Sequence, residues 1–157
     1  MKITFLTFGK SNFPFVKEGM ELYEKRISHF VQYERIEINA LSNTNSLSKK
    51  EIKEKEGEAI LKKIHPSDEV ILLDEKGQRF TSLKWAEFIG KRLDSGSKNL
   101  VFVTGGAYGF SPQVYERADS KLSLSDMTFS QQIIRLFFCE QLYRALTIIK
   151  GIPYHNE

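Results

Sequence analysis

The chain has 157 residues, 41% of them hydrophobic, which suffices for one compact core and not for two, so we expect a single domain over residues 1–157. Lys and Arg number 23 against 20 Asp and Glu, and this mildly basic balance permits RNA binding without requiring it. No apolar run approaches the roughly 18 residues of a spanning helix, and the apolar start is too short for a signal peptide, so no membrane association is expected.

Cys139 is the only cysteine, which excludes an intramolecular disulfide, a redox pair and a CxxC metal site. A chain without disulfides suits a reducing compartment. We therefore predict a cytoplasmic protein.

The N-terminal third predicts strand, helix and strand. Residues 3–8 form an apolar run that ends at Gly9, a pattern typical of a buried strand and a turn. Pro14 begins an apolar spacing that fits a helix as far as Phe30. Residues 33–38 then alternate as a second strand.

A polar loop and a charged helix come next. Residues 39–48 hold three Asn and three Ser, which predicts an exposed or disordered loop. Ser48 and Glu51 form a capping-box pattern at the start of a helix over residues 49–64. Its interleaved charges indicate a solvated face with ion pairs rather than an RNA-binding surface.

The middle of the chain repeats strand and helix. The apolar run 70–73 predicts a parallel strand, and residues 74–77 are expected to turn the chain. A helix is predicted over residues 82–93, ended by residues 95–97, and residues 100–103 predict another buried strand. The expected core residues of the helix are Leu83, Ala86, Phe88, Ile89 and Leu93.

This alternation indicates an α/β fold with a mostly parallel sheet. In such sheets ligands bind beyond the carboxyl ends of the strands, where Leu73 and Gly105 are expected to lie. Gly105 and Gly106 either let the backbone approach a ligand or simply form a tight turn. Neither a GxGxxG fingerprint nor a GxxxxGK[ST] phosphate loop is present.

The C-terminal third predicts a short strand over residues 122–125 and a long apolar helix over residues 129–149. Between them, residues 124–129 would expose backbone groups able to read the edge of an adenine. The alternative is that Ser125 or Thr128 only caps the helix. The apolar excess of the helix suits burial on more than one side, either in a dimer or at the centre of one core.

Four segments, in the order in which they follow one another along the chain, resemble those of the RlmH family. Its members are SPOUT-class methyltransferases of large-subunit ribosomal RNA. The segments are Val101-Phe102-Val103-Thr104-Gly105-Gly106-Ala107-Tyr108-Gly109, Leu124 to Phe129, Glu140-Gln141-Leu142-Tyr143-Arg144-Ala145 and Gly151-Ile152-Pro153-Tyr154-His155. The likeness also covers Lys2-Ile3, Gly9-Lys10, Tyr23 to Arg26 and Glu56-Gly57, and so spans nearly the whole chain.

The resemblance implies a SPOUT-type α/β fold with a C-terminal trefoil knot, and a homodimer. It implies that S-adenosylmethionine donates a methyl group to N3 of a pseudouridine in 23S ribosomal RNA, without a metal. The residues implied to hold the donor are Leu73, Gly105, Leu124, Ser125, Asp126, Met127, Thr128 and Phe129.

Three residues near the C-terminus are implied to be catalytic. N3 of pseudouridine carries a proton, so a base such as His155 would help the transfer, Tyr154 would stack on the base, and Arg144 would bind phosphate. The plainer alternatives are a frayed tail and an Arg144–Glu140 ion pair. Many relatives end in a basic residue, whereas this chain ends in Glu157.

Two other functions remain open: a noncatalytic ribosome-binding factor, and an α/β enzyme whose Gly105-Gly106 loop holds a phosphate.

A net charge of +3 makes the assembled ribosome a better substrate than naked RNA. The candidate phosphate contacts are Lys10, Lys49, Lys50, Arg117 and Lys121.

Overall fold

The structure is a computed structural model that describes residues 1–96 and 98–156. The predicted helix end at Ser97 and the terminal Glu157 therefore lie outside the described residues. The strands form one parallel sheet in the order β2-β1-β4-β3-β5, which confirms the α/β prediction. They are β1 (Lys2–Phe8), β2 (Gln32–Ile38), β3 (Glu69–Gln78), β4 (Leu100–Val103) and β5 (Ser120–Leu122).

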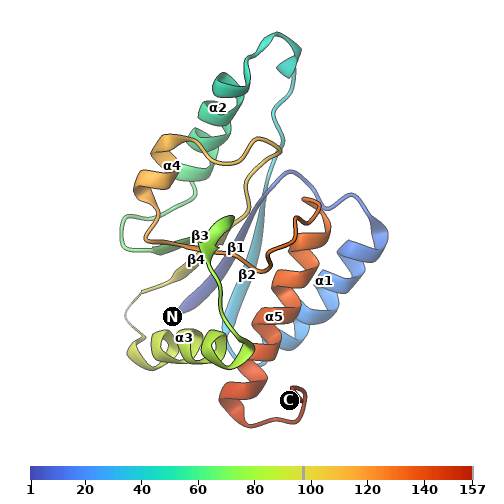
Figure 1. The fold of residues 1–157 in the computed structure, drawn as a ribbon, viewed down its shortest axis with the longest axis vertical. Coiled ribbons are helices and arrows are strands. Elements are labelled where there is room, and N and C mark those ends of the chain that lie inside the picture. The colour runs from blue at the N-terminus through green and yellow to red at the C-terminus, as the bar shows by residue number, and fades with distance from the viewer. Residues whose placement is uncertain (97, 157) are drawn as a thin grey trace.

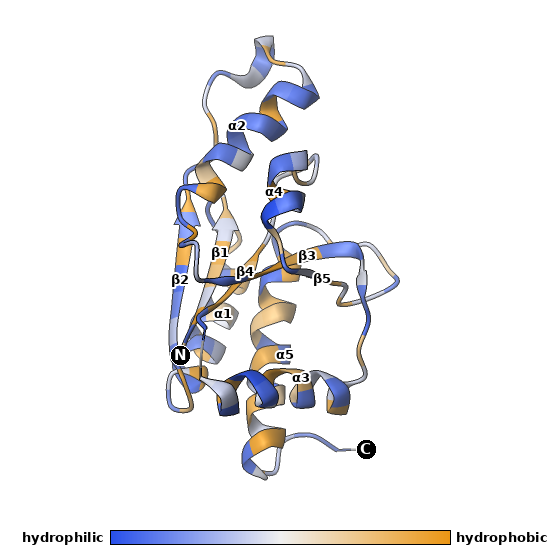
Figure 2. Cartoon of the chain, turned by 90° about the vertical axis from the view of Figure 1, so that its left-hand side faces the viewer, coloured by the Kyte–Doolittle hydropathy of each residue, from blue (hydrophilic) through white to orange (hydrophobic). Residues whose placement is uncertain are grey.

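Helices cover both faces of this sheet (Figures 1 and 2). On one face Phe5 and Phe102 pack against Phe138 in a core shared with α1, α3 and α5. On the other face Val103 packs with the apolar residues of α2 and α4. The helices are α1 (Pro14–Ile27), α2 (Lys49–Leu61), α3 (Ser82–Ser95), α4 (Pro112–Arg117) and α5 (Ile133–Lys150), with a 3-10 turn, η1 (Thr44–Ser46).

The predicted capping box of α2 is confirmed. The Glu51 N–H donates to Ser48 Oγ at 3.1 Å, and the Ser48 N–H donates to Glu51 Oε1 at 3.4 Å. The predicted solvated face of α2 does not include Glu56 and Gly57, which are buried against the loop after β4. Figure 2 shows that the exposed remainder of α2 is largely hydrophilic.

The turn predicted at residues 74–77 is wrong, because these residues lie inside β3. The Lys76 N–H does donate to Asp74 Oδ1, as in a local turn, but pairing with β5 then resumes. Leu73 and Gln78 both pair with Leu122, so the residues between them form an irregularity in the strand.

The apolar face predicted for α3 was partly wrong. Leu83 is 46% exposed, whereas Trp85, which was not predicted, is only 4% exposed and donates its indole N–H to the Gln141 carbonyl. Ala86 and Ile89 are buried as predicted. The inward face of the helix thus begins two residues later than the apolar spacing suggested.

The C-terminal elements are shifted from their predicted positions. The strand expected over residues 122–125 is β5, which ends at Leu122, and α5 begins at Ile133 rather than at residue 129. Neither Ser125 nor Thr128 caps this helix, since the Ile133 N–H donates to Ser130 Oγ. The short α4 was not predicted, and threading of a knot remains a prediction.

None of the described helices is long and apolar enough to cross a bilayer.

Two glycine substitutions test this packing. A Cβ on Gly77 would lie 2.6 Å from the backbone nitrogen of Leu122, so we expect Gly77→Ala to lower the free energy of unfolding by about 1–3 kcal/mol. A Cβ on Gly90, inside α3, would make ordinary contact with Ile149, so Gly90→Ala should raise it by up to about 1 kcal/mol. Urea unfolding measures both, and equal effects would contradict the packing of β3 on β5.

Candidate functional site

A cavity of about 490 Å³ opens beyond the carboxyl end of β4 and beside the second half of β3, where residues 73–76 line it. Its walls are the loop that follows β4, the segment that follows β5, and the first turn of α5. Its volume is within the range of small-molecule sites, roughly 300–1,000 Å³. Its position is the one expected for ligands in a parallel sheet.

The cavity gathers seven of the eight residues predicted to hold a donor: Leu73, Gly105, Leu124, Ser125, Met127, Thr128 and Phe129. Asp126 does not line it. Its side chain is 74% exposed and forms an ion pair with Arg79 on the outside of the segment.

Local hydrogen bonds shape the segment after β5. The Ser123 hydroxyl donates to the Ser125 carbonyl, and the Met127 N–H donates to Ser125 Oγ, both at 2.9 Å. The Ser123 N–H donates to the Gln78 carbonyl and so anchors the segment to β3. These bonds hold the segment as an ordered wall rather than as the start of a helix.

The loop after β4 is held from two sides. Gly109 has a φ of +82° and donates its N–H to the Gly106 carbonyl, which closes a tight turn. Gln131 also donates its side-chain amide to that carbonyl, at 3.3 Å. Position 106 requires glycine because the Glu56 side chain lies close to its backbone: a Cβ there would be 2.3 Å from Glu56 Oε2.

Two polar side chains in the cavity were not assigned a role from the sequence. Thr104 is buried, and its Oγ1 has no hydrogen-bond partner among the described residues. Tyr115 donates its hydroxyl to Asp74 Oδ2, and burial, together with this hydrogen bond, raises the pKa of Tyr115 to about 12. Tyr115 therefore stays a neutral donor at physiological pH. Sequence patterning could not have found it, since α4 is only six residues long.

A family model described as a predicted SPOUT methyltransferase matches residues 1–155. The chain belongs to the SPOUT methyltransferase family. It is 46% identical over 157 residues to the ribosomal RNA large subunit methyltransferase H of Parabacteroides distasonis, with both chains fully covered. Proteins of the same name from Christiangramia forsetii and Cytophaga hutchinsonii are each 48% identical over 156 residues and cover at least 99% of either chain.

These findings confirm the predicted resemblance and favour an enzyme over a noncatalytic binding factor. Membership of the family implies S-adenosylmethionine as the methyl donor. The cavity fits such a ligand, because loop backbone and apolar side chains line it and the hydroxyl of Thr104 has no partner among the described residues.

The three residues predicted to be catalytic lie together at the C-terminus of this methyltransferase. Tyr154 donates its hydroxyl to Glu140 Oε1 at 3.0 Å, and Arg144 Nη2 pairs with the same oxygen at 2.5 Å. Arg144 Nη1 lies 3.1 Å from His155 Nδ1. The tail is therefore docked on α5 rather than frayed, and the alternative Arg144–Glu140 ion pair is also present.

Burial, with hydrogen bonds to Tyr23 and Glu140, raises the pKa of Tyr154. The phenol is therefore neutral and donates to Glu140. Its ring packs edge-on against Tyr143, with the Arg144 guanidinium over its face.

This tail cluster and the cavity are far apart in one chain. Arg144 lies ten residues after Ile134, the α5 residue that lines the cavity, which corresponds to about 15 Å along the helix. Figure 1 shows the C-terminus at the opposite end of α5 from the loops that form the cavity. Within one chain, the predicted donor-binding residues and the predicted catalytic residues of the tail therefore lie apart.

The candidate phosphate contacts differ in their surroundings. The Arg117 guanidinium already donates to the carbonyls of His65 and Asp68 and pairs with Asp119, so its role is structural. The ammonium groups of Lys49 and Lys121 lie over the rings of Tyr108 and Tyr115, respectively. Lys10 lines a second cavity.

The lining of the cavity predicts which changes weaken donor binding. Leu124→Ala removes apolar contact area, and we expect the Kd for S-adenosylmethionine to rise about fivefold or more. Asp126→Asn, in the same segment but outside the cavity, is the matched control and should leave the Kd unchanged. Calorimetric titration measures both, and the reverse pattern would place the ligand elsewhere.

Proposed function

We propose that the protein transfers a methyl group from S-adenosylmethionine to N3 of a pseudouridine in the 23S RNA of the large ribosomal subunit, on the assembled ribosome. The names of the full-length relatives support the RNA substrate. The observation that carries the proposal is the 490 Å³ cavity. Segments that are far apart in the sequence of this family member bring seven of the predicted donor-binding residues to its lining. Residues 1–157 would act as one cytoplasmic domain.

The residues divide into a donor site and an acceptor site. Leu73, Gly105 and the cavity-lining residues of segment 124–129 would hold S-adenosylmethionine, which supplies an electrophilic methyl group on a sulfonium. His155 would accept the N3 proton, directly or through water. Arg144 and Tyr154 would hold the phosphate and the base of the target nucleotide.

The distance between cavity and tail supports a homodimer in which the tail of one copy faces the cavity of the other. The helices α1 and α5 lie side by side (Figure 1), and large apolar side chains are exposed on both of them and just before α1. They are Phe13, Phe15, Leu22 and Phe137, of which Phe15 is 58% exposed. Large exposed apolar side chains on two neighbouring helices are typical of an interface.

Tail variants separate donor binding from turnover. His155→Ala and Tyr154→Ala should bind S-adenosylmethionine as tightly as the unchanged protein does, because neither residue lines the cavity. Both should lose methylation of ribosomes, by roughly 100-fold or more if they take part in proton transfer and base binding. Undiminished methylation by both variants would remove the tail from the mechanism.

A mixture tests whether the two parts come from different copies. His155→Ala and Leu124→Asp should each be inactive alone, the second because a carboxylate enters an apolar part of the cavity. Mixed dimers contain one intact tail opposite one intact cavity, so the mixture should regain part of the activity. A mixture that stays inactive would contradict a shared site.

A charged residue on the exposed apolar surface tests the dimer itself. Phe15→Asp should shift the protein to a monomer in analytical ultracentrifugation and abolish methylation, since a charge cannot be buried in an apolar interface without a partner. Leu83→Asp is the control, because Leu83 is similarly exposed on α3, away from this surface. A fully active Phe15→Asp monomer would contradict the proposal.

A further inference from the structure

A second cavity, of about 620 Å³, lies next to the 490 Å³ cavity proposed to hold the methyl donor. The two share Gly106, Ala107, Tyr108 and Gln131, so they meet at the loop after β4. The second cavity extends from this loop to α2 on one side and to the loop after β1 on the other. A group bound in it would therefore be adjacent to a methyl donor in the first.

Glu56 of α2 lines this second cavity. Its side chain is 8% exposed, and its Oε2 accepts no hydrogen bond from any described residue. Burial raises the pKa of the Glu56 carboxyl, and the backbone of Gly106 opposes this only in part. A buried acceptor without a donor is destabilising, so a ligand that supplies an N–H would relieve that cost.

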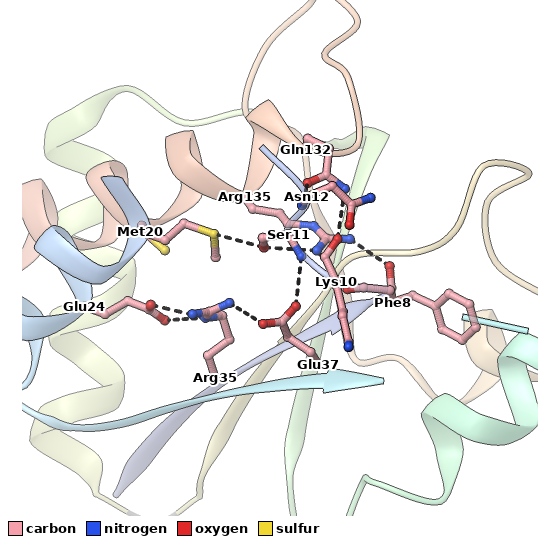
Figure 3. Close-up of polar contacts among 12 residues, drawn as sticks. Phe8, Lys10, Ser11, Asn12, Met20, Glu24, Arg35, Glu37, Gln132 and Arg135 are labelled. Carbon is pink, nitrogen blue, oxygen red and sulfur yellow. Dashed lines mark hydrogen bonds and ion pairs between the residues drawn. The ribbon is translucent and has the colours of Figure 1, made fainter. Parts of the chain in front are cut away.

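Arg135 of α5 also lines the cavity and is 1% exposed. Its guanidinium donates to the carbonyls of Phe8 and Gly9 and to Ser11 Oγ, which leaves its Nε without a partner among the described residues (Figure 3). No described carboxylate lies within ion-pair distance of it, in contrast to Arg35, which pairs with Glu24 and Glu37. Its positive charge favours a ligand that carries acceptor oxygens.

The remaining polar side chains of the cavity are mostly amides: Asn12, Asn39, Gln131 and Gln132. Gln132 donates to the Lys10 carbonyl and accepts from the Asn12 N–H, which fixes the loop after β1 to α5 (Figure 3). Lys10 also lines the cavity and can attract a phosphate. The cavity thus offers a buried acceptor from α2, and a cation and amide donors from the other elements.

Pseudouridine has matching chemistry. Its sugar is attached through carbon, so both ring nitrogens carry protons, and two carbonyl oxygens flank N3. In uridine the N1 proton is absent because N1 carries the sugar, and the corresponding edge presents a C–H that cannot donate to a carboxylate.

We propose that the second cavity receives the target base and that Glu56 accepts its N1–H, which makes Glu56 the residue that selects pseudouridine over uridine. This inference rests on the proposed function and names the part of the substrate that the site reads. A site built around a buried hydrogen bond rejects an analogue that lacks the partner far better than an apolar site does, because its own polar group is left unpaired.

The test uses ribosomes that carry pseudouridine at the target position and otherwise identical ribosomes that carry uridine. The unchanged protein should show a kcat/KM at least about tenfold higher with pseudouridine. Glu56→Met keeps the length of the side chain but removes the acceptor, so it should lower kcat/KM with pseudouridine to the level with uridine and leave the uridine value unchanged. Glu56→Gln keeps a neutral acceptor and should be intermediate.

Glu58→Gln removes the same charge from the exposed face of α2 and should behave as the unchanged protein does. The Kd for S-adenosylmethionine and the thermal midpoint show whether each variant is folded, and Glu56→Gln carries the test if Glu56→Met unfolds. A preference that is missing in the unchanged protein or retained in both Glu56 variants would overturn the inference. An equal loss of kcat/KM on both kinds of ribosome would also overturn it, because Glu56 would then serve only to hold the loop that contains Gly106. If the unchanged protein methylates neither ribosome, the proposed function itself fails.

Discussion

Burial of β4 on both faces is the constraint on which the arrangement of the site depends. All four of its residues are at most 3% exposed, between β1 and β3 and between two layers of helices. Thr104 still donates its N–H to the Leu6 carbonyl, so the chain leaves the sheet only at Gly105. The loop that follows therefore begins at the carboxyl edge, where parallel strands leave a crevice for ligands.

α2 holds this loop at two points. A Cβ on Gly106 would meet the Glu56 carboxyl at 2.3 Å, and a Cβ on Gly57 would meet Ser111 Oγ, also at 2.3 Å. Adjacent residues of one helix thus contact the beginning and the end of the loop that separates the two cavities. The small residues at Gly57 and Gly106 are explained by these close approaches and not by positive φ angles.

The sequence predicted the features that arise from local patterns. Continuous apolar runs identified β1 and β4 because a parallel strand covered on both faces has no polar side, and the capping box of α2 depends on residues only three apart. The motif resemblance named residues that the fold brings together around the first cavity, with the exception of Asp126, which lies outside its lining.

What sequence could not predict depends on contacts between distant residues. The Asp and Gly of the irregular part of β3 have turn chemistry and predict a turn, whereas pairing with β5 keeps the strand intact. Glu56 and Arg135 are charged, yet both side chains are buried against backbone from elsewhere in the chain, which no local pattern predicts. The docked tail depends on Glu140, fourteen residues before Tyr154.

The docked tail also bears on how a shared site would form. Glu140 Oε1 accepts from both Tyr154 and Arg144, and Arg144 in turn reaches His155, so the predicted catalytic side chains are already ordered within one chain. Ordering a side chain during association costs roughly 0.5–1.5 kcal/mol for each flexible group. In the proposed dimer much of that cost is met when the chain folds, since the tail adopts its arrangement on its own α5. Association would then have to position two preformed parts, and the exposed apolar side chains of α1 and α5 would supply the driving force for it.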